Sequence, residues 1–346
     1  MKFGLVYDFR NPERWRRPFP ELYAALLEQI QEVERLGYDA VFVTEHHFIN
    51  DGYCPSPLVA LGAIAARTSR IRIGTWVALL PLYHPLRLAE DAAVVDQLSG
   101  GRLELGVGLG YREEEFAGFG IPLRHRRGRM EEGVEVLKRA LAGERFSFEG
   151  RHFHLRDVRV TPPPCQQPFP LWLAARSPVT ARRAARFRAD LMLVGPPSVY
   201  EEYAAALRAQ GEAPSRYRLL GLLAWAVSDD PERYWAEAGP HFAYTASLYG
   251  QWYSQRGDLP EDREWRQWAT WSPEDFRRAG MVLVGTPEQV RDGILAARRV
   301  LPYDYIVSWA TLPGQDPKRA MESLELFARK VMPALRAAAE PSEGQP

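Results

Sequence analysis

Short apolar runs alternate with longer amphipathic segments along most of this 346-residue chain. Runs such as 2–7, 39–44 and 102–107 are apolar and partly β-branched, which is typical of strands buried in a sheet. Between them, segments such as 20–36 repeat apolar residues at helical spacing. Strands that alternate with helices in this way favour βαβ units and a parallel sheet.

The alternation continues along the whole chain. Strands are predicted at 2–7, 39–44, 71–80, 102–107, 170–174, 191–194, 219–227 and 305–307. Helices are predicted at 20–36, 57–68, 86–98, 131–141, 178–188, 197–210, 287–299 and 317–336. Eight strand–helix pairs in a chain of this length predict an α/β fold, a (β/α)8 TIM barrel, as a single domain over 1–336.

Three segments do not follow the alternation. Residues 231–280 are rich in Trp and Tyr and show no clear strand, so we expect a mostly helical insertion between strands seven and eight. Residues 146–154 have the pattern of a small β-hairpin. Residues 337–346 are expected to be a disordered tail.

The composition is that of a globular protein. The formal net charge is +0, with 46% hydrophobic and 25% charged residues, which gives no footprint for nucleic acid or an acidic membrane surface. We find no apolar run of transmembrane length and no signal peptide before the first strand, and Cys54 and Cys165 suggest no disulfide framework. We therefore expect a cytoplasmic protein.

The most informative motif, Thr44 to Phe48, follows the second predicted strand. It places Glu45, His46 and His47 at a carboxyl-terminal strand end, where barrel enzymes carry their chemistry. A single His there is more often structural, but three adjacent polar groups favour general acid–base chemistry near neutral pH. Neighbouring residues on an extended chain point to opposite faces, so we expect no metal ion shared by the two histidines.

Glycines recur at Gly106, Gly108 and Gly110, directly after the fourth strand. The spacing differs from the GxGxxG dinucleotide fingerprint. Two interpretations stay open: a tight turn, or a strand face without side chains that leaves room for a flat ring.

A second motif, Arg176 to Thr180, follows the fifth strand. Ser177 is placed to cap the next helix, and the helix N-terminus with the Ser177 and Thr180 hydroxyls could hold an anion. A plain N-cap is the simpler interpretation. Arg127 lies in the basic stretch 124–129, from which one Arg could reach a phosphate.

In their order along the chain, these motifs resemble the bacterial luciferase-like flavin monooxygenase family. The resemblance runs from Met1 to about Val194 and resumes in the last helix. It is carried by residues 2–4, 44–48, 80–85, 89–91, 96–102, 106–116 and 119–120. The combination is specific to the family and not to a substrate.

The resemblance implies roles for individual residues. His46 would lie beside the flavin and be essential for its oxygen chemistry, with Glu45 and His47 lining the same pocket. The acidic residue of the family after strand four falls on Glu115, and a non-proline cis peptide beside the flavin falls at Trp76–Val77. Phosphate contacts fall on three residues: Arg127, Ser177 and Thr180.

Two positions depart from the family pattern. Gly108 stands where true luciferases have a cysteine, so light emission is not expected. Leu109 stands where the family has a phosphate-binding arginine, so Arg176 is our candidate to complete that site. We expect the substrate pocket to be lined by Phe48, His84 and, from an insertion that acts as an apolar lid, Phe242, Tyr244 and Trp252.

The resemblance implies a monooxygenase that uses reduced FMN and O2 to oxidise a hydrophobic organic substrate through a C4a-peroxyflavin. A separate flavin reductase would supply the reduced FMN, because no dinucleotide fingerprint is present, and a homodimer is expected because the family is commonly dimeric. One alternative is a hydride-transfer oxidoreductase of the same superfamily that depends on coenzyme F420. Another is a flavin-binding subunit without catalysis.

Overall fold

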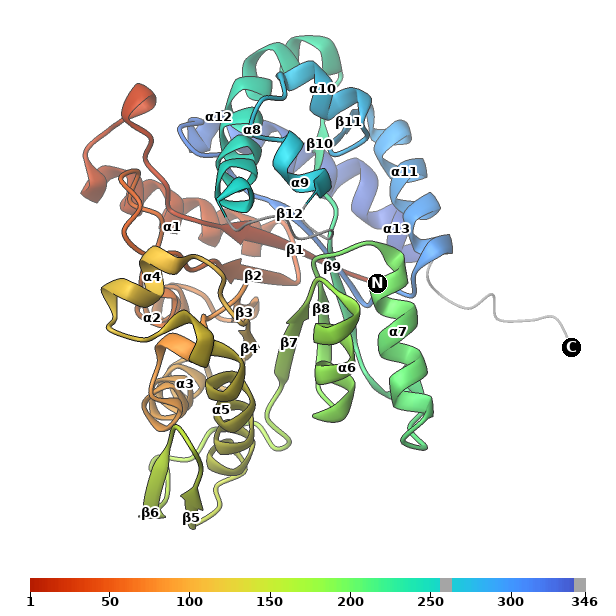
Figure 1. Ribbon diagram of the computed structural model, residues 1–346. Coiled ribbons are helices and arrows are strands. Elements are labelled where there is room, and N and C mark those ends of the chain that lie inside the picture. Colours follow the sequence, from red (N-terminus) through yellow and green to blue (C-terminus); the bar gives the residue numbers. More distant parts are fainter. Residues whose placement is uncertain (256–262, 339–346) are drawn as a thin grey trace, which may run out of the picture. The chain divides into compact units, whose positions relative to one another are not determined.

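The structure, a computed structural model, describes residues 1–255 and 263–338. Eight parallel strands close into a barrel in the order β1-β12-β9-β8-β7-β4-β3-β2 (Figure 1). They are β1 (Lys2–Tyr7), β2 (Ala40–Val43), β3 (Arg72–Thr75), β4 (Leu103–Val107), β7 (Leu171–Ala175), β8 (Asp190–Leu193), β9 (Leu219–Leu222) and β12 (Tyr305–Trp309). Each predicted strand has a counterpart, which confirms the (β/α)8 prediction.

The helices that follow the strands bury one apolar stripe each. In α1 (Phe19–Arg35) the stripe is Leu22, Leu26, Ile30 and Val33, as the spacing predicts. The others are α2 (Pro57–Arg67), α3 (Pro85–Ser99), α4 (Glu113–Gly118), α5 (Arg126–Leu141), α6 (Pro178–Arg186), α7 (Pro197–Arg208), α8 (Pro231–Ser254), α9 (Arg263–Gln267), α10 (Pro273–Arg278), α11 (Pro287–Val300), α12 (Pro317–Leu326) and α13 (Met332–Ala337).

Internal contacts divide the chain into two compact units. The central unit is Val41–Arg218, and the split unit combines Met1–Ala40 with Leu219–Pro346. Both units contribute strands to the barrel, and the single-domain boundary at 336 stays a prediction. In the central unit, α6 and α7 pack side by side (Figure 1). Strands β5 (Phe146–Glu149) and β6 (His154–Val158) form an antiparallel pair there, which confirms the predicted hairpin.

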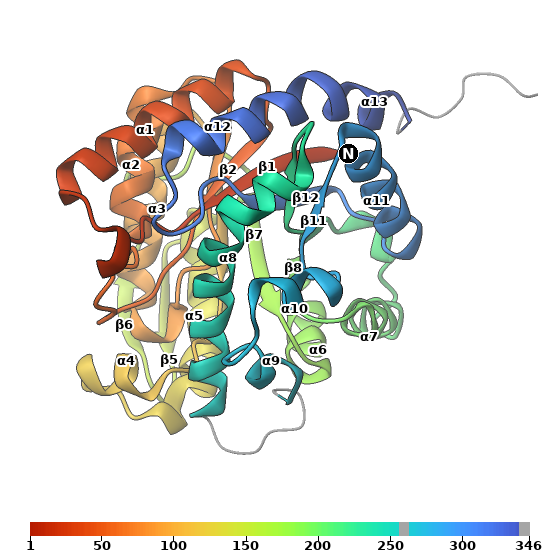
Figure 2. The same cartoon turned by 90° about the horizontal axis from the view of Figure 1, so that it is seen from above.

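The split unit carries the predicted helical insertion, as α8, α9 and α10. These helices enclose a core of their own, in which Trp235, Phe242, Trp268 and Phe276 are buried. Strands β10 (Trp225–Val227) and β11 (Leu283–Gly285) form a separate two-stranded parallel sheet. Helices α1 and α12 lie side by side in the same unit (Figure 2).

Three boundaries differ from the sequence prediction. The run 219–227 forms two strands, β9 and β10, that belong to different sheets. The run 71–80 is strand only as β3, and its later apolar residues are buried in an irregular segment, so burial explains their character. Helix α13 includes Ala337, the first residue of the predicted tail, and 339–346 lie outside the described residues.

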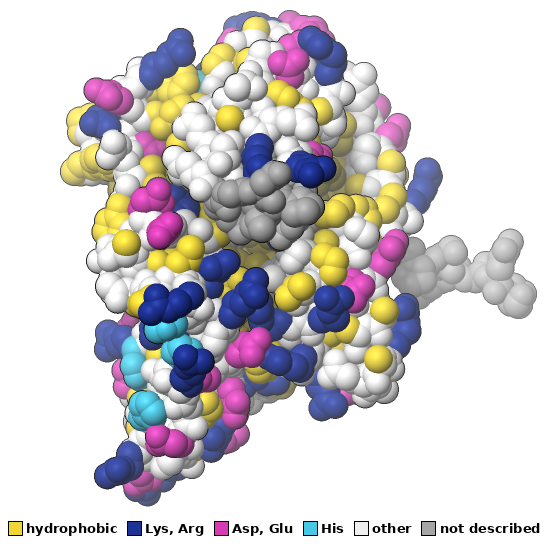
Figure 3. Space-filling model, viewed as in Figure 1, with side chains coloured by type: hydrophobic (Ala, Val, Ile, Leu, Met, Phe, Trp, Pro, Cys, Tyr) yellow, Lys and Arg dark blue, Asp and Glu magenta, His cyan; other side chains and the backbone are white. Residues whose placement is uncertain are grey.

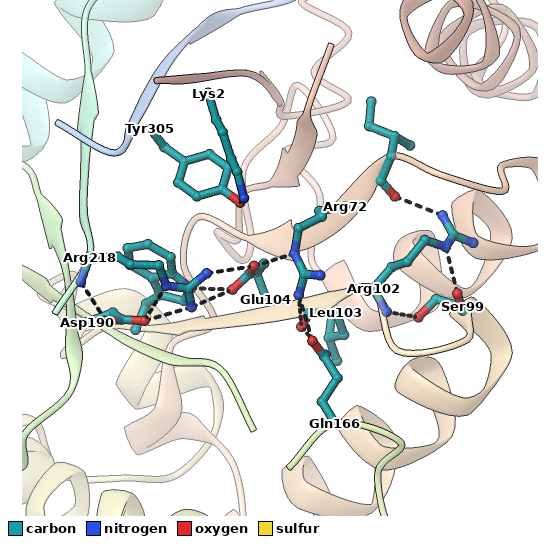
Figure 4. A network of polar contacts seen from close by, with 12 residues as sticks. Lys2, Arg72, Ser99, Arg102, Leu103, Glu104, Gln166, Asp190, Arg218 and Tyr305 are labelled. Atoms are coloured by element: carbon teal, nitrogen blue, oxygen red, sulfur yellow. Dashed lines mark hydrogen bonds and ion pairs between the residues drawn. The ribbon is translucent and has the colours of Figure 1, made fainter. Parts of the chain in front are cut away.

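A buried glutamate joins the amino-terminal strand ends of the central unit (Figure 4). Glu104, the second residue of β4, is fully buried and accepts hydrogen bonds from Arg72 Nε and from Trp172 Nε1, the latter at 2.7 Å. Arg218 donates to both of its oxygens at 3.1 Å, and also to Asp190. Both oxygens of Glu104 are therefore used in holding strands β3, β4 and β7 to the residue before β9.

Candidate active site

The opposite, carboxyl-terminal strand ends of the central unit carry the predicted motif. Strand β2 ends at Val43, and Glu45, His46 and His47 follow it with 2%, 6% and 7% of their surfaces exposed. Buried ionisable groups need hydrogen-bonding partners. The partners of these three side chains define the site.

His46 is paired with Glu115, from helix α4. Its Nδ1 lies 2.7 Å from Glu115 Oε1, which also accepts the His47 N–H at 2.9 Å and lies 3.4 Å from Arg112 Nη1. Burial opposes ionisation of Glu115, but the bonds from His46 and His47 and the charge of Arg112 outweigh it and lower its pKa. An ionised Glu115 assigns the hydrogen to His46 Nδ1, so in the neutral imidazole Nε2 is the ring nitrogen that carries no hydrogen.

His47 engages a different carboxylate. Its Nε2 lies 2.7 Å from Glu45 Oε1, which also accepts the Tyr83 hydroxyl at 2.9 Å, while Glu45 Oε2 accepts the Leu79 N–H at 2.9 Å. The two imidazoles thus serve separate carboxylates. In the described part of the chain, no group of three or more His, Cys, Asp or Glu is arranged to hold a metal ion.

The segment beside Glu45 contains the cis peptide that the resemblance implies, at Trp76–Val77. The prediction is confirmed at that bond. The Ala78 N–H donates to Gly106 O at 2.8 Å, and the Gly108 N–H donates to Ala78 O at 2.9 Å. Segment 76–83 therefore runs from the cis peptide along β4 to the partners of Glu45.

Gly106 and Gly108, after strand four, lie so close to the segment with the cis peptide that a side chain would not fit, which we did not predict. A Cβ on Gly108 would lie 2.4 Å from Val77 Cγ2, and one on Gly106 would lie 2.4 Å from Thr75 O. Neighbouring protein atoms therefore occupy the faces on which one of the two open interpretations gave room to a flat ring. The two glycines allow the close approach of the segment with the cis peptide, and their role in cofactor binding stays a prediction.

The candidate phosphate residues lie around the start of α6. Ser177 is its N-cap and forms a capping box with Thr180, whose Oγ1 accepts the N–H groups of Ser177 and Arg176 at 3.0 Å each. Burial lowers the pKa of Arg183 on this helix, and the nearby charge of Arg127 adds to that effect. Ser177, Thr180 and Arg176 therefore lie together at the helix start, and the place of Arg127 beside them stays a prediction.

This region of the central unit is basic beyond the predicted residues. Lys and Arg side chains cluster beside histidines over α5 and the β5–β6 hairpin (Figure 3). The His125 and His152 rings lie 5.2 Å apart, and desolvation, followed by the charges of Arg124, Arg151 and Arg129, lowers the pKa of His125. An anion would be attracted to this face.

Two predicted pocket residues belong to the central unit. Phe48 is 61% exposed and has a positive φ of 58°, a conformation that is uncommon outside glycine. Its ring lies 5.6 Å from that of Phe119, which in turn lies 4.8 Å from the His47 ring. Phe48 and Phe119 therefore form an exposed aromatic surface beside His47. His84, by contrast, packs edge-on against Phe153 of the hairpin.

The other three predicted pocket residues belong to the split unit. Phe242 is buried against Trp235 and Phe276, and the Trp252 ring packs edge-on against Tyr249. The Tyr244 ring lies 5.0 Å from the guanidinium carbon of Arg10. Their role in a substrate pocket stays a prediction.

Sequence reasoning missed three residues of the site. Tyr83 bonds Glu45, Arg112 contacts Glu115, and Phe119 packs on His47. Arg112 and Glu115 are three residues apart, a helical pairing that the sequence does contain. Tyr83 and Phe119 lie in two of the motifs that carry the resemblance, but their contacts with Glu45 and His47 depend on tertiary structure.

Comparison with known proteins gives the chain a family context. The model of a family described as luciferase-like monooxygenase matches residues 1–303. The uncharacterised protein y4wF of Sinorhizobium fredii is 38% identical over 64% of this chain and 66% of its own length, so the match spans slightly less than two thirds of that relative. The oxygenase component of the flavin-dependent trigonelline monooxygenase of Acinetobacter baylyi is 25% identical, over 91% of this chain and 90% of its own.

Solved structures extend the comparison. The monooxygenase RslO1 of Streptomyces bottropensis superposes with a TM-score of 0.79 and 28% identity, covering 96% of this chain and 99% of that one.

The sequence relatives also include the F420-dependent glucose-6-phosphate dehydrogenase of Kineococcus radiotolerans. It is 37% identical, over 45% of this chain and 48% of its own length. No helix in the described ranges is long and apolar enough to cross a membrane.

Proposed function

The chain belongs to the luciferase-like monooxygenase family, and from this premise we propose that it is an FMN-dependent monooxygenase. It would use reduced FMN and O2 to oxidise a hydrophobic organic substrate. The observation that carries the proposal is the buried His46–Glu115 pair at the carboxyl end of the barrel strands, in a chain similar over nine tenths of its length to an oxygenase component.

The residues present fit a flavin mononucleotide. Ser177, Arg176 and the start of α6 would hold the phosphate, with Arg127 as a further proposed contact, while Thr180, which donates to the Ser177 carbonyl, would hold the cap in shape. At the other end of the site, Glu115 Oε2 is buried and has no hydrogen-bond partner among the described residues. When bound, reduced FMN supplies the electrons with which O2 is activated.

The protein groups would then move and hold protons. Glu115 fixes the tautomer of His46, so that His46 Nε2 accepts or donates a proton near the reacting oxygen. Glu45, held by Tyr83 and the Leu79 N–H, fixes the orientation of His47. The exposed rings of Phe48 and Phe119 offer an apolar contact to the organic substrate beside these histidines.

We also propose that a separate flavin reductase supplies the reduced FMN. A relative that is an oxygenase component supports this, since such a component implies a reducing partner. In a coupled assay, the protein should form product with reduced FMN generated by any added flavin reductase. Product formation from NADH and FMN without a reductase would contradict the proposal.

A homodimer is proposed through helices α2 and α3. These helices pack together in the central unit, yet Val59 is 76% exposed, Leu98 60% and Val94 45%. Adjacent exposed apolar side chains are typical of an interaction surface. Light scattering of the purified protein should give the mass of two chains, and Leu98→Asp with Val59→Asp should give one.

The second candidate function is F420-dependent hydride transfer, which the 37% identity to a dehydrogenase of that class supports. A flavin-binding subunit without catalysis is the third. The buried Glu45, His46 and His47, each with a defined partner, favour an enzyme over that third function.

The test is a titration with reduced FMN and, separately, with reduced F420, each followed by mixing with air-saturated buffer. The proposal predicts FMN binding and a protein-dependent change in the absorbance and rate of flavin reoxidation, which would justify a substrate screen. Binding of F420 alone, without any reaction with oxygen, would assign the protein to hydride transfer. Flavin binding with no substrate-dependent oxygen uptake would support the non-catalytic subunit.

A further inference from the structure

A cavity lies in the split unit. It is lined by residues of α8, β10, β11, β12 and α12, among them Phe242, which is also a predicted pocket residue, and its empty space, open solvent at its mouth included, measures about 440 Å³. None of its lining residues is Asp, Glu, Lys, Arg or His. Because a charged group is costly to bury without a counter-charge, the walls disfavour an ionic ligand.

Two hydrogen-bond donors of this cavity lack acceptors. Trp225 and Trp235 both line it, with 5% and 6% of their surfaces exposed. The Nε1 atom of each is buried and has no hydrogen-bond partner among the described residues. A buried indole N–H normally finds a partner, because leaving it unpaired costs the desolvation of the donor.

The hydroxyls that line the cavity are already used by the protein. Ser308 Oγ accepts the backbone N–H of Trp225 at 2.9 Å and donates to the carbonyl of Trp225 at 3.2 Å. Ser323 Oγ accepts the N–H of Val227 at 2.8 Å. Among the buried side-chain polar atoms of the lining residues, the two indole Nε1 atoms are the ones without a hydrogen-bond partner in the described part of the chain, and the matching ligand group is an acceptor.

Both indoles pack against a phenylalanine ring, which holds them in place before any ligand arrives. The Trp225 ring stacks on Phe327 with centroids 4.7 Å apart and planes at 21°. The Trp235 ring packs at 5.8 Å on Phe242. Fixed donors in a mostly aromatic and aliphatic wall lower the conformational cost of binding.

We propose that this cavity binds a small, uncharged, mainly apolar molecule through one hydrogen-bond acceptor, such as the oxygen of a ketone, ester or ether. The polar lining residues Ser308, Gln315 and Ser323 can also hold water, so water in the cavity is one outcome of the test below. The proposal does not rest on the function proposed for the central unit, although Phe242 is also a predicted pocket residue.

The test uses the indole ¹H–¹⁵N signals of the full-length protein without flavin. Trp225→Phe and Trp235→Phe assign two of the ten Trp signals, and cyclopentanone is the probe. Trp268 is the matched control, because its Nε1 is also buried without a partner among the described residues but it does not line the cavity. We expect saturable shifts at Trp225 and Trp235 and none at Trp268.

Cyclopentane, which has the same shape without the oxygen, should bind roughly tenfold more weakly. Ala238→Leu, which fills the cavity from α8, should abolish the shifts, and a crystal of the unaltered protein soaked in cyclopentanone should show the ketone between the indoles. Equal binding of the two probes, shifts spread over all Trp signals, or a soaked crystal with only water in the cavity would overturn the proposal. None of these outcomes depends on whether the protein is an oxygenase.

Discussion

Two buried glutamates of the central unit stand at opposite ends of the same strand and differ in how their oxygens are used. Glu104, near the start of β4, has both oxygens bonded by Arg72, Trp172 and Arg218. Glu115, after the end of β4, receives His46, His47 and Arg112 on Oε1 alone. Among the described residues its buried Oε2 has no hydrogen-bond partner.

This difference indicates a structural role for Glu104 and a chemical role for Glu115. A carboxylate whose oxygens are saturated by the protein has no capacity left for a ligand, and it stabilises the packing around it. A buried carboxylate with an unused oxygen carries a desolvation cost that a ligand, water or proton can relieve. Such costs are tolerated at functional sites, and the imidazole beside Glu115 adds a group that can exchange protons.

Replacing His46, the partner of Glu115, should have the largest effect of the predicted changes, and the effect should be on product formation. His46→Ala should leave the fold intact and lower the rate of product formation by about a thousandfold, because the proton-transferring group is lost. Product formed per reduced FMN, once the substrate screen has given a product, is the measurement. His154→Ala, an exposed hairpin histidine paired with Glu149, is the control and should not change turnover. Unchanged turnover in His46→Ala would remove His46 from the mechanism.

Replacing Glu104, whose two oxygens are both hydrogen-bonded, should lower the stability of the protein. Glu104→Leu leaves Arg72 and Arg218 without their shared partner, and we expect a loss of about 3 kcal/mol in the free energy of unfolding. The estimate is at the lower end of the range for fully buried pairs, because both guanidinium groups are partly exposed. Denaturant unfolding gives the value. A loss of less than about 0.5 kcal/mol would contradict the structural role.

Removing the Tyr83 hydroxyl, which donates to Glu45, should have a smaller effect than the substitutions of His46 or Glu104. Tyr83→Phe removes one of three hydrogen bonds to Glu45 and keeps the ring, so we expect about 1 kcal/mol lower stability and a severalfold lower kcat with little change in KM. Steady-state kinetics with saturating reduced FMN tests it. A change confined to stability would limit Tyr83 to a structural role.

The smallest effect is in the pH dependence of stability. The pKa of Glu115 is lower in the folded protein than its ordinary value of 4.5, so its ionisation favours folding above that pH. This contribution is lost as the pH falls through the lower, folded-state pKa. The difference in unfolding free energy between the unaltered protein and Glu115→Gln should therefore shrink below about pH 4.5. Glu113→Gln, exposed on the same helix, should show no such trend.

Much of the fold was predictable because its signals are local. The alternation of apolar runs and helical stripes places all eight barrel strands and the helical insertion. Two predicted strand boundaries were wrong. Residues 71–80 are apolar because they are buried, and only part of the run is a strand, whereas the run 219–227 forms two strands in different sheets. Helix α4 was missed as an element, although its Glu115 was placed by resemblance.

The site was predictable in its residue types and not in its pairings. Resemblance placed the cis peptide at Trp76–Val77, and helix-start chemistry placed the Ser177 cap. That His46 and His47 use different carboxylates depends on the tertiary approach of α4 and segment 76–83 to β2. The glycines show the limit most clearly, because only the structure reveals that Val77 occupies the space beside Gly108.

The measurement that tests the central claim most directly applies one substitution to both glutamates. Glu→Gln keeps the size and removes the charge, and both the unfolding free energy and the turnover per folded molecule are measured for Glu104→Gln and Glu115→Gln. We predict that Glu104→Gln loses more stability and keeps its turnover, whereas Glu115→Gln loses less stability and at least about a hundredfold in turnover. Equal losses of turnover in the two variants, or the larger loss in Glu104→Gln, would contradict the assignment of chemistry to the carboxyl-terminal cluster.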